Sequence, residues 1–282
     1  MGERRSLTVD GSQATLSTVL KSRDQERTPR ALAKGRSMRL ALLAAVLLAT
    51  SAASAQGLDR DTLLTDAPAV PSQGTVRLTG GVTGTSASEG VGNTQGQANI
   101  SGSIGWTPVK NLHADVGAYY QVGAQGPSAR LRYQILSQER FGFDLTGGVR
   151  FKTVGFHADH GEAEFLVAAG RKFGQFELVL NGAFGVETGG GGGKDIEVKG
   201  FGGYRFNDAL RAGLDSRLQT EVSDAEATST PKVGRDYDLT AGPAISWMIA
   251  RTIQVQALVG VAQPKKTDRT SPVGVLSASI DF

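Results

Sequence analysis

One short segment of this chain combines the residue types of an acid–base or metal site. It reads Phe156-His157-Ala158-Asp159-His160, and here Asp159 could orient a histidine that acts as a general base. No nucleophile stands at a fixed spacing from it, and a metal would find only three ligands on a predicted loop. We therefore interpret these residues as solvated loop side chains and predict no catalytic residue, no metal site and no cofactor.

A second set of residues places charge at alternate positions of segments whose other positions are apolar. Buried charges must be paired or hydrated, so these faces predict either a water-filled passage or a salt-bridged interior. With Lys172 and Glu187 the set holds ten basic and ten acidic residues, which predicts no strong preference for cations or anions. The other members, which we expect to line a lumen, are Arg77, Asp115, Arg130, Arg132, Asp144, Arg150, Lys152, Glu162, Glu164, Glu177, Glu197, Lys199, Arg205, Arg211, Asp215, Arg217, Asp236 and Asp238.

The composition is that of a folded chain rich in glycine, with 38 Gly, 9 Pro and no Cys among 282 residues. The lack of Cys excludes disulfides, thiolate metal sites, a catalytic thiol and a lipoprotein anchor. A secretory signal peptide is predicted at 38–55, with Arg36 and Arg39 before an apolar run and Ala53-Ser54-Ala55 as cleavage site. We expect residues 1–37 to be a misassigned start or an extended leader.

Removal of the first 55 residues changes the charge of the chain. They hold 9 of the 30 Lys and Arg and 4 of the 27 Asp and Glu, so 21 basic and 23 acidic residues remain. The mature chain is slightly acidic, and we predict no nucleic-acid partner.

From residue 74 onward, apolar and polar residues alternate with the two-residue period of a strand. Residues 56–73 lack this pattern and are predicted to be a periplasmic N-terminal arm. Short turns and longer links alternate between the segments, as in an antiparallel meander. Pro243 falls within one segment, which calls for a bulge at Gly242-Pro243 or a strand count that is wrong by two. The twelve predicted strands lie near 75–85, 96–107, 111–123, 127–138, 141–154, 161–173, 175–187, 195–206, 209–221, 236–249, 251–263 and 272–282.

Two features indicate that the apolar face of these strands meets lipid. Most segments run ten to thirteen residues, close to the length that crosses a bilayer at a tilt. Aromatic residues gather near the short turns, as expected of a rim at the membrane interface. The predicted rim comprises Trp106, Phe141, Phe143, Phe173, Phe176, Tyr204, Phe206 and Trp247.

With these features the chain resembles the outer-membrane β-barrel proteins of Gram-negative bacteria over residues 74–282. The last strand fits, because Leu276, Ala278, Ile280 and Phe282 repeat at every second position, a pattern that the assembly machinery reads in that class. The resemblance implies an all-β fold: one transmembrane antiparallel up-and-down barrel of about 12 strands in the outer membrane, with both termini periplasmic. It also implies outer-membrane lipid and the barrel-assembly machinery as partners.

Three functions stay open for such a barrel. The first is a narrow, weakly selective, porin-like pore for small solutes. The second is a structural or partner-binding barrel in an envelope-spanning complex for secretion, adhesion or motility, with periplasmic proteins contacting residues 56–73. The third is an outer-membrane hydrolase that would use the histidine segment described above.

Overall fold

The structure, a computed structural model, describes residues 58–86, 97–121, 124–154, 157–188, 193–223, 237–265, 267 and 269–282. The predicted leader at 1–37 and signal peptide at 38–55 lie outside the described residues. In the described part of the chain, no helix has the length and apolar character needed to cross a membrane.

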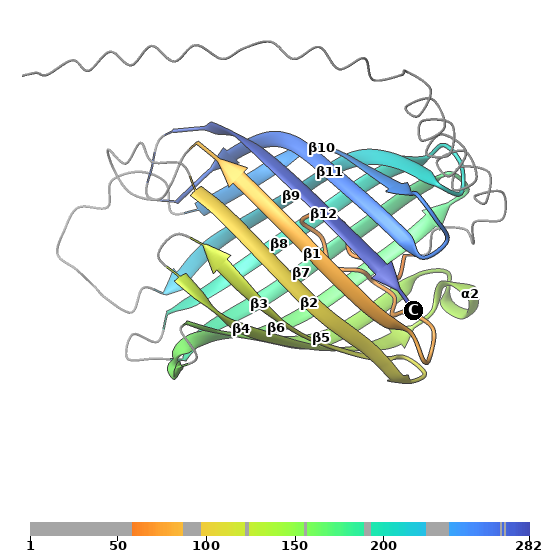
Figure 1. Cartoon of the computed structure of the whole chain (residues 1–282), viewed down its shortest axis with the longest axis horizontal. Coiled ribbons are helices and arrows are strands. Elements are labelled where there is room, and N and C mark those ends of the chain that lie inside the picture. The colour runs from red at the N-terminus through yellow and green to blue at the C-terminus, as the bar shows by residue number, and fades with distance from the viewer. Residues whose placement is uncertain are drawn as a thin grey trace, which may run out of the picture. The chain divides into compact units, whose positions relative to one another are not determined.

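Twelve antiparallel strands form one closed barrel in which each strand pairs with its sequence neighbours and the first pairs with the last (Figure 1). This confirms the predicted fold class and strand number. The strands are β1 (Val76–Thr85), β2 (Gln97–Val109), β3 (Leu112–Gln121), β4 (Ala124–Leu136), β5 (Asp144–Val154), β6 (His157–Phe173), β7 (Phe176–Thr188), β8 (Lys194–Arg205), β9 (Leu210–Ser223), β10 (Tyr237–Met248), β11 (Ile253–Gln263) and β12 (Ser271–Asp281).

The seam between β1 and β12 closes the barrel in a regular register. Leu78 lies opposite Ile280, and Arg77 lies opposite Asp281. At the end of the seam the N–H of Phe282 donates to the carbonyl of Val76 at 2.9 Å, and the reverse bond measures 3.1 Å. Closure leaves no free sheet edge among the described strands, as a lipid environment requires.

The two faces of the strands meet different surroundings. Large apolar side chains on the outer face are freely exposed, among them Leu214 (66%), Val259 (70%) and Phe165 (60%). The intervening residues point inward and are mostly polar or charged. A continuous apolar outer surface around a polar interior is the arrangement of a barrel in lipid, and it is the inverse of a soluble protein.

The link between β4 and β5 differs from the tight turn predicted there. Residues Gln138–Phe141 form the one-turn helix α2, so Phe141 and Phe143 precede β5 instead of beginning it. The turn is stabilised at both ends: Asp144 accepts from the backbone N–H of Gln138 at 2.8 Å, and Gly142 takes the left-handed conformation at φ 82°.

Two further expectations differ from the structure. Strand β6 begins at His157, so the histidine segment predicted as a loop is largely part of a strand. Pro243 produces neither a bulge nor a change in strand number. Instead, the β10–β11 pairing stops at Ala241 and resumes at Ala244 in the same register. Gly260 makes this possible, because a Cβ there would lie 2.2 Å from the carbonyl oxygen of Ala241.

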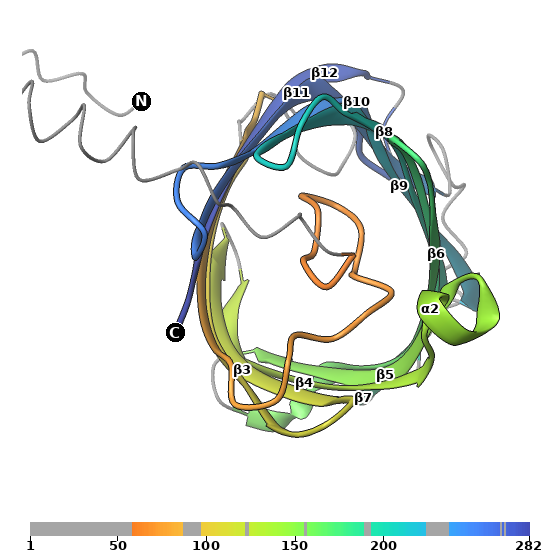
Figure 2. The same ribbon diagram turned by 90° about the vertical axis from the view of Figure 1, so that its right-hand side faces the viewer.

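The segment before β1 lies inside the barrel rather than outside it. Residues 58–73, here called the plug segment, follow a loop within the ring of strands (orange in Figure 2). The N–H of Ala69 donates to the carbonyl of Leu58 at 3.3 Å, which brings the two ends of the loop together. Residues 58–71 of the predicted N-terminal arm thus lie in the lumen, where their charged side chains and leucines find partners, whereas Ser72 and Gln73 are exposed.

Candidate functional site in the barrel lumen

The plug segment is held at mid-barrel by two carboxylates that contact cations of the wall. Asp66 accepts from Arg130 at 2.5 Å and from Lys199 at 2.9 Å. Asp61 contacts Arg130 at 2.7 Å and Arg132 at 2.9 Å. These contacts tie the loop to β4 and β8, two strands that are not neighbours in the barrel.

The cations around the plug segment also determine its protonation. Burial alone would raise the pKa of Asp61 and of Asp66. The positive charges of Arg130 and Arg132 outweigh this for Asp61, and those of Lys199 and Arg130 do so for Asp66, so both pKa values are lowered from their usual range. Both carboxylates are therefore ionised at neutral pH, and the ion pairs that hold the plug segment are intact there.

Backbone hydrogen bonds at Asp66 and a second ion-pair group at the start of the plug segment hold it further. Asn181 of β7 accepts from the N–H of Asp66 at 2.6 Å and donates to its carbonyl at 3.0 Å. At the short-turn end, Arg77 contacts Asp281 at 2.7 Å and Asp59 at 3.2 Å, while Arg60 also pairs with Asp281. The seam strands β1 and β12 thus hold the start of the loop.

Apolar contacts explain why part of the inner wall is not polar. Leu63 and Leu64 of the plug segment pack against Leu258, Val273 and Val275, which point inward from β11 and β12. Leu258 is only 1% exposed. Such side chains would be unfavourable in a water-filled lumen, so the wall is built to receive this loop.

The lumen candidates that the structure describes lie on the inner face, and most of them belong to three ion-pair groups, of which the Arg77 group at the seam is described above. In the central group, Lys152 contacts Glu162 and Glu164, Arg150 bridges Glu164 and Glu197, and Arg217 joins Glu197 to Asp238. Arg130, Arg132, Lys199 and Asp115 complete it around the plug segment. Near the short turns, Glu177 pairs with Arg205 at 3.1 Å and Arg211 at 3.0 Å.

Three candidates have other surroundings. Asp215 pairs with no cation among the described residues and accepts instead from the hydroxyl of Thr65 at 2.6 Å and the N–H of Leu64 at 3.0 Å. Asp144 accepts from the side chain of Gln134 at 3.1 Å besides its bond to α2. Asp236 lies outside the described residues.

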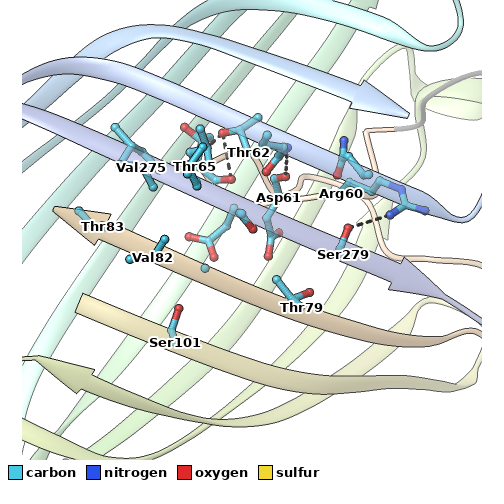
Figure 3. A pocket seen from close by; sticks show the side chains of 18 of the residues that line it. Arg60, Asp61, Thr62, Thr65, Thr79, Val82, Thr83, Ser101, Val275 and Ser279 are labelled. Carbon is cyan, nitrogen blue, oxygen red and sulfur yellow. Dashed lines mark hydrogen bonds between the residues drawn. The ribbon is translucent and has the colours of Figure 1, made fainter. Parts of the chain in front are cut away.

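A cavity of about 310 Å³ remains between the plug segment and the wall (Figure 3). The plug segment bounds it with Arg60 to Asp66, and β1, β2 and β12 bound it with Thr79, Ser101, Ser279 and their neighbours. Arg60 reaches across one end and donates to Ser279 at 3.0 Å. The cavity has a mixed lining, polar for the most part but with Leu63, Leu64 and Val275 as apolar members, and it lies next to the seam of the barrel.

The predicted aromatic rim residues lie beside the short turns. Trp106, Phe173, Phe176, Phe206 and Trp247 are between 47% and 61% exposed. Phe176, Tyr204 and Phe206 form two edge-to-face contacts with ring centroids 5.1 Å apart. Phe141 and Phe143, with α2, lie at the same end.

The residues considered for acid–base or metal chemistry have only a partial structural description. No group of three or more His, Cys, Asp or Glu side chains that could hold a metal ion is found among the described residues. The backbone of 157–160 begins strand β6, but the side chains of these residues lie outside what the structure describes, so their contacts are not given.

Sequence reasoning missed the functional residues of the plug segment itself. Asp61, Thr65 and Asp66 lie in a stretch without periodicity, which gave no reason to place them in the lumen. A signal was present in the inward positions of the last strands, where Val273 and Val275 interrupt an otherwise polar face. An apolar patch in a predicted lumen indicates a segment that covers it.

The closed barrel, its apolar outer surface and its charged interior are the features of a membrane-spanning β-barrel. No protein-family model matches this chain, and no curated protein matches it either. Among solved structures, the porin NanC in a rhombohedral crystal form is similar, with a TM-score of 0.52 and 8% identity over 73% of this chain and 98% of that chain. The COG4313 outer-membrane channel of Pseudomonas putida F1 also has a TM-score of 0.52, with 12% identity over 76% of this chain and 97% of that one. At such low sequence identities, these similarities show a shared fold and nothing more.

Proposed function

We propose that this protein is a narrow outer-membrane pore for small solutes, and that its own plug segment narrows the lumen. The observation that carries this proposal is the polar cavity of about 310 Å³ between the plug segment and the seam strands. Twelve strands enclose more space than side chains alone fill, and the plug segment takes up part of the excess. Solutes pass through what remains.

The ion pairs of the lumen support weak rather than strong charge selectivity. Arg130 contacts three carboxylates, and Arg150 and Lys199 contact two each. Cations and carboxylates that neutralise one another leave little net field to attract one sign of ion.

Export to the periplasm and assembly into the outer membrane are part of the same proposal. A signal peptide at 38–55 would take the chain of a Gram-negative bacterium to the periplasm, where the barrel-assembly machinery would recognise its last strand. Leu276 and Ile280 of that strand face outward, and Phe282 is 71% exposed, so these side chains are presented to a partner or to lipid. The predicted partners thus remain lipid and the assembly machinery.

Planar-bilayer recording of the refolded full-length protein tests the pore. We expect small, stepwise conductance from protein whose folding is verified by a heat-dependent shift in gel mobility. A correctly folded barrel that stays silent would contradict the pore and favour the alternative, a structural barrel in an envelope complex. Residues 58–71, most of the arm that this alternative would use to contact partners, are engaged in the lumen, which favours the pore.

A further inference from the structure

The cavity beside the plug segment has one wall made of short, neutral side chains. Thr79 and Thr83 of β1, Ser101 of β2 and Ser277 of β12 project into it from neighbouring strands (Figure 3 labels the first three). Ser101 is exposed although it faces inward, because no part of the plug segment covers it. Hydroxyl groups on this wall can both donate and accept hydrogen bonds.

The opposite wall carries charges that are already neutralised. Arg130 and Lys199 share Asp66, and Arg150 contacts Glu164 at 2.6 Å. At the near end, Arg60 and Arg77 share Asp281. Five cations and two carboxylates line the cavity among the described residues, and each of them has an oppositely charged partner. Some of the partner carboxylates, such as Asp281 and Glu164, lie outside the lining, so the charges are paired and the wall offers both hydrogen-bond donors and acceptors.

These two walls treat ions and neutral solutes differently. An ion that enters loses part of its hydration and finds counter-charges already engaged, so it gains little in return. A neutral solute with several hydroxyls exchanges its bonds to water for bonds to threonine, serine, guanidinium and carboxylate groups. No aromatic side chain lines the cavity among the described residues, so a sugar ring is not retained by stacking.

We infer that the solutes of this pore are neutral and polyhydroxylated, of the sugar and polyol class, and that they move along the hydroxyl wall of β12, β1 and β2. The inference rests on the proposed pore function and names its substrate class. A volume of about 310 Å³ accommodates one small ring with its water shell but no large oligomer in compact form. Weak, multiple hydrogen bonds suit passage, because a solute must both enter and leave.

Proteoliposome swelling with matched probes tests the solute class. The probes are a neutral hexose and the hexuronate of the same ring size, and the reversal potential in a KCl gradient is recorded on the same protein. We expect faster swelling with the hexose and a reversal potential close to zero. Equal or faster entry of the hexuronate, or a strongly selective reversal potential, overturns the inference while leaving the pore in place. No conductance and no swelling would overturn both.

Two adjacent residues of β2 provide a matched pair of variants for the path. Ser101→Phe directs a ring into the cavity, whereas Ile100→Phe directs it to the lipid face, where Ile100 is 57% exposed. We expect swelling with the hexose to fall severalfold in S101F and to stay unchanged in I100F. Equal rates in the two variants would place the solute path elsewhere.

A variant that removes hydroxyl groups from the cavity wall without changing side-chain size tests hydrogen bonding to the solute separately from the width of the pore. The double change Thr79→Val and Thr83→Val keeps the side-chain shape and deletes two hydrogen-bonding groups. Loss of one net hydrogen bond corresponds to about a fivefold change in an equilibrium constant, so hexose entry should fall by about that factor, and KCl conductance should fall by clearly less. A parallel fall in both would indicate only a narrower pore and would contradict recognition by hydroxyls.

Discussion

Asp66→Asn is the change that tests how the plug segment is held. The Asp66 carboxylate lies 2.5 Å from Arg130 and 2.9 Å from Lys199, and its side chain is only 9% exposed. Breaking a buried ion pair typically costs about 3–5 kcal/mol. Here Arg130 keeps Asp61 and Asp115, and Lys199 keeps Glu197, so the loss is smaller. We expect about 2 kcal/mol, which shifts the equilibrium between docked and released plug segment about thirtyfold.

The chain itself offers a clean probe for this shift, because it contains no Cys. Ala67 is 1% exposed, so a thiol in Ala67→Cys reacts with a water-soluble maleimide only when the plug segment leaves its place. D66N should raise the labelling rate about thirtyfold, following the population of the released state. Glu221→Gln is the control, because its pair with Lys265 is partly exposed and far along β9 from the plug contacts. A labelling rate in D66N within twofold of the parent would refute this account of plug docking.

Three further predictions concern the plug segment and the seam. The pKa values of Asp61 and Asp66 are lowered by the cations beside them. Docking of the plug segment is therefore fully stabilised above the carboxyl pKa of the unfolded chain, about 3.9, and weakens as the pH falls below that value. The rate of Ala67→Cys labelling, normalised to that of a free thiol, should be constant from about pH 8 to 5 and rise below about pH 4. Leu258→Ala should weaken docking by about 2–3 kcal/mol, and unchanged labelling in that variant would contradict a role for the inward apolar patch. Phe282→Ala removes a ring that is 71% exposed but keeps the backbone hydrogen bonds to Val76. The yield of folded barrel in the outer-membrane fraction should therefore fall, while the thermal unfolding temperature of the purified protein changes little. A large drop in that temperature would show instead that the ring stabilises the folded state.

The strands of this barrel could be predicted because a two-residue period records which solvent each face meets. Lys199, Phe201 and Gly203 of β8 share one face, and the sequence alone separates that face from the other. The period says nothing of what fills the interior, however. Phe201 points inward and packs with Leu58 of the plug segment, a contact that no local pattern predicts.

The parts that could not be predicted depend on contacts between residues distant in sequence. The plug segment has no period of its own, and its place is set by Arg130, Asn181, Lys199 and Asp215, which the chain reaches 64 to 151 residues later. Pro243 was expected to disturb the sheet, but a glycine on the neighbouring strand allows close backbone approach. Helix α2 depends on Asp144 accepting from the N–H of Gln138, a local bond that alternation does not reveal.

The central claim is that the plug segment narrows a conducting lumen, and single-channel conductance tests it most directly. The parent protein and the double variant Asp61→Asn/Asp66→Asn are recorded in the same bilayer and salt, each shown to be folded by its heat-dependent gel shift. We predict small steps from the parent and larger or more variable steps from the variant, because releasing the plug segment widens the path. Equal steps from both would contradict a narrowing role for the plug segment, and silence from both would contradict the pore.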